Sequence, residues 1–216
     1  MIAPQFIYLA LALAALGGAS YLRDTWRGRV APNRVTWALW GVEGVLAFVV
    51  EVQQNVGLAS AMTLMLGLAP LAVVAVSFRH HHGVWRIGAF DVVCAVVSLG
   101  GLVFWALVNE PTVALVSFVC ADQVAALPTL RKSWLKPSTE SSRVFFLGSL
   151  NCGLTVLTLR HFTSAGVLFP GSIAVTDLVI ALSVVTRVGP RLRGELPRGT
   201  VFAREETPRS KSPREN

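Results

Sequence analysis

Long apolar runs alternate with short polar connections along most of the chain. Seven such runs occur, at residues 2–22, 35–52, 56–78, 87–108, 113–130, 144–159 and 167–186. A helix needs about 20 apolar residues to cross the hydrocarbon core of a bilayer, and most of the runs are long enough. Only 16 residues separate Arg143 from Arg160 in the sixth run, so both arginines would have to extend toward the interfaces. The pattern predicts an all-α integral membrane protein with seven transmembrane helices.

The basic residues concentrate in every second connection. The first, third and fifth connections and the segment after the last run hold 18 of the 19 lysines and arginines, and Arg160 is the exception. Because Lys and Arg are enriched in cytoplasmic connections, we expect the N-terminus outside and the C-terminus inside. No Lys or Arg precedes the first run and Arg23 follows it, which is the reverse of a secretory signal. We therefore expect a multi-pass protein of the plasma (inner) membrane that retains its first helix.

The amino-acid composition of the chain indicates which kind of partner surrounds or binds it. The chain is 53% hydrophobic and 14% charged, far fewer charges than the roughly 25% of a soluble domain. Its net charge of +7 is spread between the apolar runs, which favours the lipid bilayer as partner over nucleic acid. Cys94, Cys120 and Cys152 lie singly within apolar runs, where cysteine usually serves as a small buried side chain.

Known catalytic and cofactor patterns are absent from the sequence. It contains no H-E-x-x-H, G-x-S-x-G or P-loop spacing, so we expect neither an enzyme nor a cofactor. The three lysines lie outside the apolar runs, which argues against a retinal Schiff base within a helix. Consecutive side chains point in different directions, so we interpret His80, His81 and His82 as a solvated loop and expect no metal site.

The chain contains an internal repeat. Residues 22–26 (LRDTW) recur as residues 130–134 (LRKSW), each closing an apolar run on the same predicted side. A basic connection with Pro32 or Pro137 follows each copy. We therefore predict a three-helix repeat in residues 1–80, a linker helix in 81–110 and a second repeat in 111–188 (3+1+3). Residues 189–216 are rich in Pro, Arg, Glu and Ser, which predicts a disordered basic cytoplasmic tail.

The second copy of the repeat carries a family resemblance. The segment from Ala126 to Trp134, followed by Pro137 and Glu140, resembles the PQ-loop motif of the SWEET and cystinosin-like transporters. Thr129 stands where that motif usually has Gln, and Ser20-Tyr21 stands where the first copy would have Pro-Gln. The resemblance implies a 3+1+3 helix plan up to about residue 186 and transport of a sugar or an amino acid.

Three carboxylates lie near the middle of predicted spans. Glu43, Asp122 and Asp177 are each about nine or ten residues from a span end. Each costs roughly 2.5 to 3.5 kcal/mol on insertion scales, so we expect them to face the bundle interior. Burial at that depth favours the neutral acid, which makes them candidates for proton uptake and release or for binding a cation.

Other polar residues share the depth of these acids. Trp40 lies on the stripe of Glu43, Asn151 matches Glu43 at the repeat shift of 108 residues, and Thr176 precedes Asp177. We expect these six side chains to bind the solute or a proton: Glu43, Asp122, Asn151, Asp177, Trp40 and Thr176. The alternative for the hydroxyl and amide groups is hydrogen bonding between helices. Pro70 and Pro128 remove backbone donors within their runs and are candidate hinges.

Two functions fit these features. The first is transport of a small polar solute (a sugar, an amino acid or a cationic metabolite) by alternating access between the two repeats, with proton coupling left open. The second is a membrane scaffold or sensor of the same fold that does not transport. The sequence leaves open whether the chain forms a homo-oligomer.

Overall fold

A computed structural model describes residues 5–53, 59–79, 85–159 and 161–195. The described part is built from long α-helices, one short 3-10 segment and one short helix, and it contains no β-strand. Their bounds are α1 (Phe6–Trp26), α2 (Arg34–Gln53), α3 (Ala59–Ser77), α4 (Ala89–Leu107), α5 (Pro111–Leu135), η1 (Pro137–Thr139), α6 (Ser142–Thr158), α7 (Ser164–Thr186) and α8 (Val188–Leu192). Arg160 and the three consecutive histidines lie outside the described residues.

Each predicted apolar run lies largely within one long helix, so the prediction of an all-helical chain is confirmed. Within the described ranges, three helices are long and apolar enough to cross a membrane: Ala89–Leu107, Pro111–Leu135 and Gly166–Thr186. Residues Leu64–Ser77 form a shorter apolar helix. The lengths and compositions of these helices therefore agree with the membrane character that the sequence predicts.

The interior of the bundle holds charged and polar side chains beside its apolar core, and the outer surface is apolar. Buried side chains include Asn33, Glu43, Asp91, Asp122 and Lys132, each at most 6% exposed. Valine, leucine and phenylalanine side chains cover the outer face of α4, such as Val93, Val96, Val103, Phe104 and Leu107. A contiguous apolar surface of this kind needs a nonpolar surrounding, which a lipid bilayer supplies.

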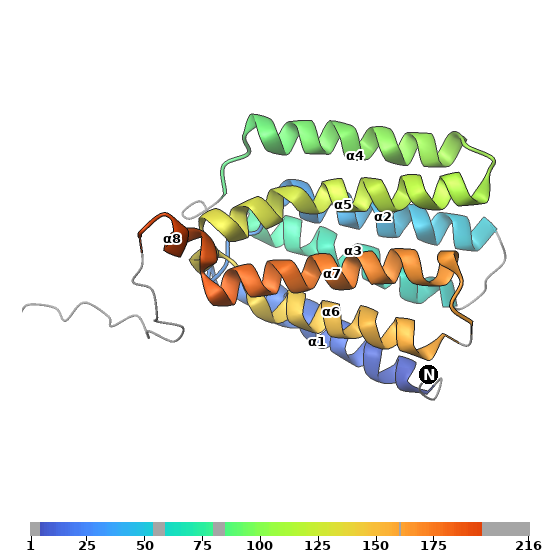
Figure 1. The fold of residues 1–216 in the computed structure, drawn as a ribbon, viewed down its shortest axis with the longest axis horizontal. Helices are drawn as coiled ribbons and strands as arrows, with labels where there is room; N and C mark the ends of the chain where they lie inside the picture. The colour runs from blue at the N-terminus through green and yellow to red at the C-terminus, as the bar shows by residue number, and fades with distance from the viewer. Residues whose placement is uncertain (1–4, 54–58, 80–84, 160, 196–216) are drawn as a thin grey trace, which may run out of the picture.

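The long helices lie side by side along the longest axis of the molecule (Figure 1). Within the first three, α3 contacts both α1 and α2; within the last three, α7 contacts both α5 and α6. Two further contacts join these groups, one between α1 and α6 and the other between α2 and α5. Helix α4 lies at the edge of the bundle and contacts α5 and α2 (Figure 1). We call α1–α3 the first unit and α5–α7 the second unit.

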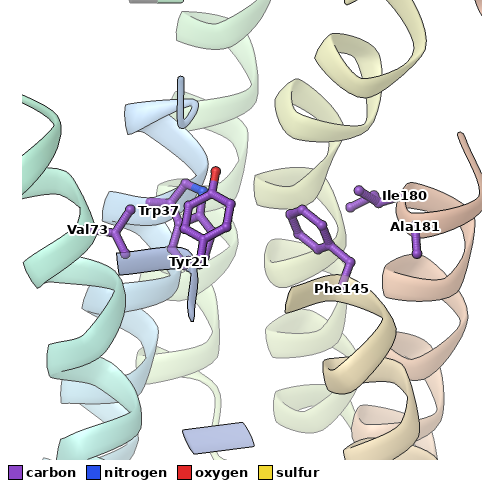
Figure 2. Packing of buried hydrophobic residues seen from close by; sticks show 6 residues of the cluster. All are labelled: Tyr21, Trp37, Val73, Phe145, Ile180 and Ala181. Carbon is purple, nitrogen blue, oxygen red and sulfur yellow. The ribbon is translucent and has the colours of Figure 1, made fainter. Parts of the chain in front are cut away.

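An aromatic cluster fills the bundle between the two units (Figure 2). The rings of Tyr21 and Trp37 stack with centroids 4.3 Å apart, and Phe145 meets Tyr21 edge-on at 6.3 Å. Val73, Ile180 and Ala181 complete the buried cluster. Because its members come from α1, α2, α3, α6 and α7, apolar packing here holds both units together.

The start of α2 is tied to the start of α4 by two fully buried polar residues. The Asn33 amide nitrogen donates to Asp91 Oδ1 at 2.8 Å, and the Gly88 N–H donates to Asp91 Oδ2 at 2.7 Å. Asn33 Oδ1 accepts from the N–H groups of Val35 and Thr36, so the same side chain caps α2. Asp91 lies near the start of the apolar run at residues 87–108, yet it is only 1% exposed.

Replacing Asn33 with alanine is expected to lower the free energy of unfolding by about 3 kcal/mol. The change removes a helix cap, which is worth about 1 kcal/mol, and a hydrogen bond to a buried carboxylate, worth about 2 kcal/mol. Denaturation of purified Asn33→Ala in detergent would measure the loss. Asn33→Asp keeps a capping oxygen but faces Asp91 with a second carboxylate; if it were as stable as the native chain, the role given to this contact would be wrong.

The first residues of the predicted tail are ordered. Gly189 and Pro190 are buried in α8, and Arg193 donates to the Leu135 carbonyl at 2.9 Å. A Cβ added at Gly189 would lie 2.0 Å from the Trp134 carbonyl oxygen, so only glycine allows this approach. The prediction of disorder was therefore wrong for residues 189–192, since contact with the end of α5 compensates for their low apolar content. Residues 196–216 lie outside the described residues.

Candidate functional site

Two of the predicted carboxylates meet in the interior. Glu43 of α2 and Asp122 of α5 lie within hydrogen-bonding reach of each other, where α2 packs on α5. Glu43 is 4% exposed and Asp122 is 6% exposed, so both acids are sealed from the surroundings. Glu43 Oε1 accepts no hydrogen bond from the described residues. Two neighbouring carboxyl groups that are buried in this way are stabilised by a proton or another cation between them.

Polar neighbours hold the Asp122 carboxyl in place. The Gln123 amide nitrogen donates to Asp122 Oδ2 at 2.9 Å, and Trp40 lies within hydrogen-bonding reach of the same carboxyl. The Thr176 hydroxyl of α7 in turn donates to Gln123 Oε1. Trp40 also meets Trp37 edge-on, with ring centroids 5.5 Å apart, which joins the site to the aromatic cluster. This chain of contacts fixes one orientation of Asp122.

Asp177 lies close to this pair but in a different environment. Its carboxyl is within electrostatic range of Asp122, and it rests against Gly148 of α6. A Cβ added at Gly148 would lie 2.2 Å from Asp177 Oδ2, so the carboxylate occupies the space that a larger residue would fill. Unlike the sealed pair, Asp177 is only half-buried.

The remaining predicted site residues are placed as follows. Asn151 is half-buried on α6, and its backbone carbonyl accepts the Thr155 hydroxyl. Its side chain makes no hydrogen bond to the described residues. Pro128 is fully buried inside α5, and Pro70 is half-buried inside α3. The structure adds Pro170 inside α7, a third candidate hinge that the sequence analysis did not identify.

Helix α4, which was predicted only as a linker, also lies beside the site. Ser98 of α4 is fully buried close to the Glu43 carboxyl, and its hydroxyl makes no hydrogen bond to the described residues. A lone serine in an apolar run gave no signal of this role. Within the described ranges, no three His, Cys, Asp or Glu side chains gather closely enough to hold a metal ion.

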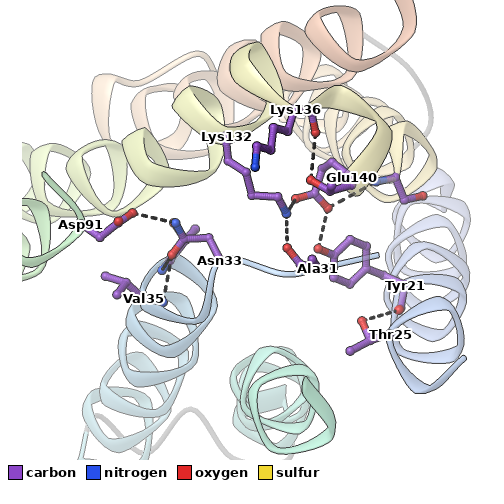
Figure 3. A network of polar contacts seen from close by, with 12 residues as sticks. Tyr21, Thr25, Ala31, Asn33, Val35, Asp91, Lys132, Lys136 and Glu140 are labelled. Carbon is purple, nitrogen blue, oxygen red and sulfur yellow. Dashed lines mark hydrogen bonds and ion pairs between the residues drawn. The ribbon is translucent and has the colours of Figure 1, made fainter. Parts of the chain in front are cut away.

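A second buried polar cluster lies at the end of the bundle near η1 (Figure 3). Lys132 Nζ lies 2.6 Å from Glu140 Oε2, and both side chains are fully buried. The Tyr21 hydroxyl donates to Glu140 Oε1 at 2.5 Å, and Lys132 also donates to the Ala31 carbonyl. We call these residues the Lys132–Glu140 cluster. The position of Lys132 after an apolar run predicted a cytoplasmic connection, and the burial of its side chain could not be predicted because its partner lies eight residues away across a turn.

The two clusters differ in chemistry. The Lys132–Glu140 cluster balances its charges internally, whereas Glu43, Asp122 and Asp177 have no basic partner among the described side chains around them. An acidic site in a nonpolar surrounding needs protons or a cationic ligand to become neutral. The acidic site is therefore the candidate site for binding. Comparison of the chain with protein-family models, with functionally characterised proteins and with solved structures finds no match.

Proposed function

We propose that the chain is a multi-pass transporter of the plasma membrane that moves a small polar solute by alternating access. Its seven long helices would each span the bilayer, with the N-terminus outside and the basic connections in the cytoplasm. The two units would rock about the acidic site and expose it to each side in turn. The solute would be an amino acid, a sugar or a cationic metabolite, and a proton would be carried with it.

The contact pattern of the helices supports the two-unit plan. In the first unit α3 touches α1 and α2, and in the second unit α7 touches α5 and α6. The contacts between the units follow the same rule. If α1 corresponds to α5 and α2 to α6, the contact of α1 with α6 corresponds to the contact of α5 with α2, and both are present. The repeated segments also occupy equivalent places: Thr25 near the end of α1 and Ser133 near the end of α5 are both buried. This correspondence agrees with the PQ-loop resemblance.

The pairing of Glu43 with Asp122 is the observation that carries the proposal. A buried acid pair destabilises a bundle unless it holds a proton or a cation, so a merely structural role is a poor explanation for it. The pair lies where the two units meet, on α2 of one and α5 of the other. Rocking of the units would separate the two carboxyls and change their access to water. Proton binding and unit movement would thus be coupled.

Uptake into proteoliposomes tests the proposal. With sugars, amino acids and cationic amines offered as labelled solutes, at least one is expected to accumulate faster when the outside is more acidic than the inside. Asp122→Asn cannot form the proton-sharing acid pair, so uptake by this variant is expected to lose its dependence on the pH gradient. Glu110→Gln changes an exposed acid at the start of the same helix and is expected to leave the dependence intact.

Two outcomes would contradict the proposal. Uptake that ignores the pH gradient in both the native chain and Asp122→Asn would rule out proton coupling. If the folded chain took up none of the solutes, the transport proposal would fail and the scaffold or sensor would be favoured.

A further inference from the structure

The Lys132–Glu140 cluster joins the two units at one end of the bundle. Lys132 belongs to α5 and Glu140 follows η1, both in the second unit. Their partners, the Tyr21 hydroxyl and the Ala31 carbonyl, belong to α1 and to the connection after it. A backbone hydrogen bond also joins the two units, from the Ala31 N–H to the Thr139 carbonyl at 2.9 Å. Moving the units apart at this end would break all of these contacts.

The cluster is also connected to the acidic site through aromatic side chains. Tyr21 belongs to both the polar cluster and the aromatic cluster, where it stacks on Trp37 (Figures 2 and 3). Trp37 contacts Trp40, which reaches Asp122. Going inward from this end, the layers are therefore the ion pair, the aromatic rings and the carboxylates. At the Lys132 end, the side chains of Lys132, Glu140 and Tyr21 are fully buried.

The buried charges of Lys132 and Glu140 are better suited to a contact between the units that opens than to a permanent one. Lys132 and Glu140 both belong to the second unit and reach the first through Tyr21 and Ala31, and apolar side chains of similar size in their place would avoid the penalty of removing ions from water. The charges of Lys132 and Glu140, in contrast, are stabilised in two arrangements. When this end of the bundle is closed they are paired with each other, and when it is open they are hydrated. We propose that the Lys132–Glu140 cluster is an interlock that holds this end of the transporter shut and releases when the two units separate. The inference rests on the proposed function only in requiring that the units move.

Removing one charge gives a specific expectation. Glu140→Met leaves the Lys132 ammonium buried without its carboxylate, which penalises the shut arrangement and favours the one in which water reaches Lys132. Lys132→Met/Glu140→Met removes both charges and keeps the volume, so the shut arrangement is expected to return. A merely stabilising contact would predict a loss of stability in the single variant without an increase in access to the interior.

Cys152 is a reporter for access. It is half-buried on α6 and lies within electrostatic range of Asp122 and Asp177. With Cys94 and Cys120 changed to serine, its reaction with a membrane-impermeant cationic methanethiosulfonate can be timed in right-side-out and inverted vesicles. Glu140→Met is expected to speed labelling about tenfold in the vesicles that expose the Lys132 end. The double variant is expected to label at the native rate or more slowly.

The matched control is the exposed ion pair of Arg193 and Glu195, whose atoms lie 2.7 Å apart. Glu195→Met makes the same substitution near the same end and is expected to leave the labelling rate unchanged. If it sped labelling as much as Glu140→Met, or if the double variant remained fast, the interlock would be refuted. Tyr21→Phe removes a single donor to Glu140, and about threefold faster labelling is expected. Should Glu140→Met fail to fold, an unchanged rate in Tyr21→Phe would refute the interlock instead.

Labelling needs no solute, so the experiment separates the two proposals. Fast labelling of Glu140→Met in a chain that takes up no solute would support the interlock and contradict transport. Solute uptake combined with native labelling rates in Glu140→Met and Tyr21→Phe would support transport and contradict the interlock.

Discussion

Replacing Gly148 with alanine is expected to lower the efficiency of solute uptake about 100-fold while leaving the protein folded. The added methyl group would lie 2.2 Å from Asp177 Oδ2, much closer than contact distance. Because a carboxylate at the end of a side chain moves more easily than a helix, Asp177 is expected to shift by about 1 Å. A displacement of that size in a binding group can reduce activity about 100-fold. Initial uptake rates over a range of solute concentrations would measure the effect.

Gly153 supplies the control for this prediction. It lies on the same helix, and a Cβ added there meets no atom within 4 Å. Gly153→Ala is therefore expected to retain native uptake and to be slightly stabilised, since alanine favours helix more than glycine does. Equal uptake by the two variants would show that the position of Asp177 does not matter for the solute.

Replacing Gly44 with alanine is expected to lower the free energy of unfolding by about 2 to 3 kcal/mol, the cost of overpacking. Gly44 of α2 faces Gly67 of α3, and an added Cβ would lie 2.5 Å from the Gly67 Cα atom and 2.9 Å from its nitrogen. These are backbone atoms, so relief requires the two helices to move apart. Small residues allow this close helix contact in membrane proteins. Thermal or denaturant unfolding in detergent would measure the loss.

Gly100→Ala is the comparison for this second prediction. Gly100 lies on α4 with open space around it, so alanine there is expected to be neutral or stabilising. If Gly44→Ala were as stable as Gly100→Ala, the tight contact of α2 with α3 would contribute nothing to the bundle.

The positions of the helices could be predicted from the sequence, whereas some of their ends could not. Each apolar run marks a helix because a long apolar segment needs a nonpolar surrounding and must satisfy its own backbone. The run at residues 113–130 ends at the first basic residue, Arg131, yet α5 continues to Leu135. The helix continues because Lys132 and Ser133 are buried there, and Lys132 finds its partner in Glu140. That pairing depends on the fold of the following turn.

The depth of the carboxylates could likewise be counted along the sequence, but their neighbours could not. The repeat shift of 108 residues makes Asn151 the counterpart of Glu43 in the second unit, but it does not say which side chain Glu43 touches. In the bundle α2 packs on α5, which brings Glu43 to Asp122. Spacing fixes how deep a residue lies in its helix, and tertiary contacts decide which helix lies beside it. The same limit explains why Ser98 of α4 was missed.

Helix α8 determines where the chain can be cut or extended. A fusion partner joined at Thr186 would remove the contact of Gly189 with Trp134 and the hydrogen bond from Arg193 to Leu135, leaving the end of α5 uncovered. A junction after Glu195 would keep both contacts and would place the attached protein beside α5, on the side that holds Lys132. Expression tags and fluorescent reporters for this chain therefore belong beyond residue 195.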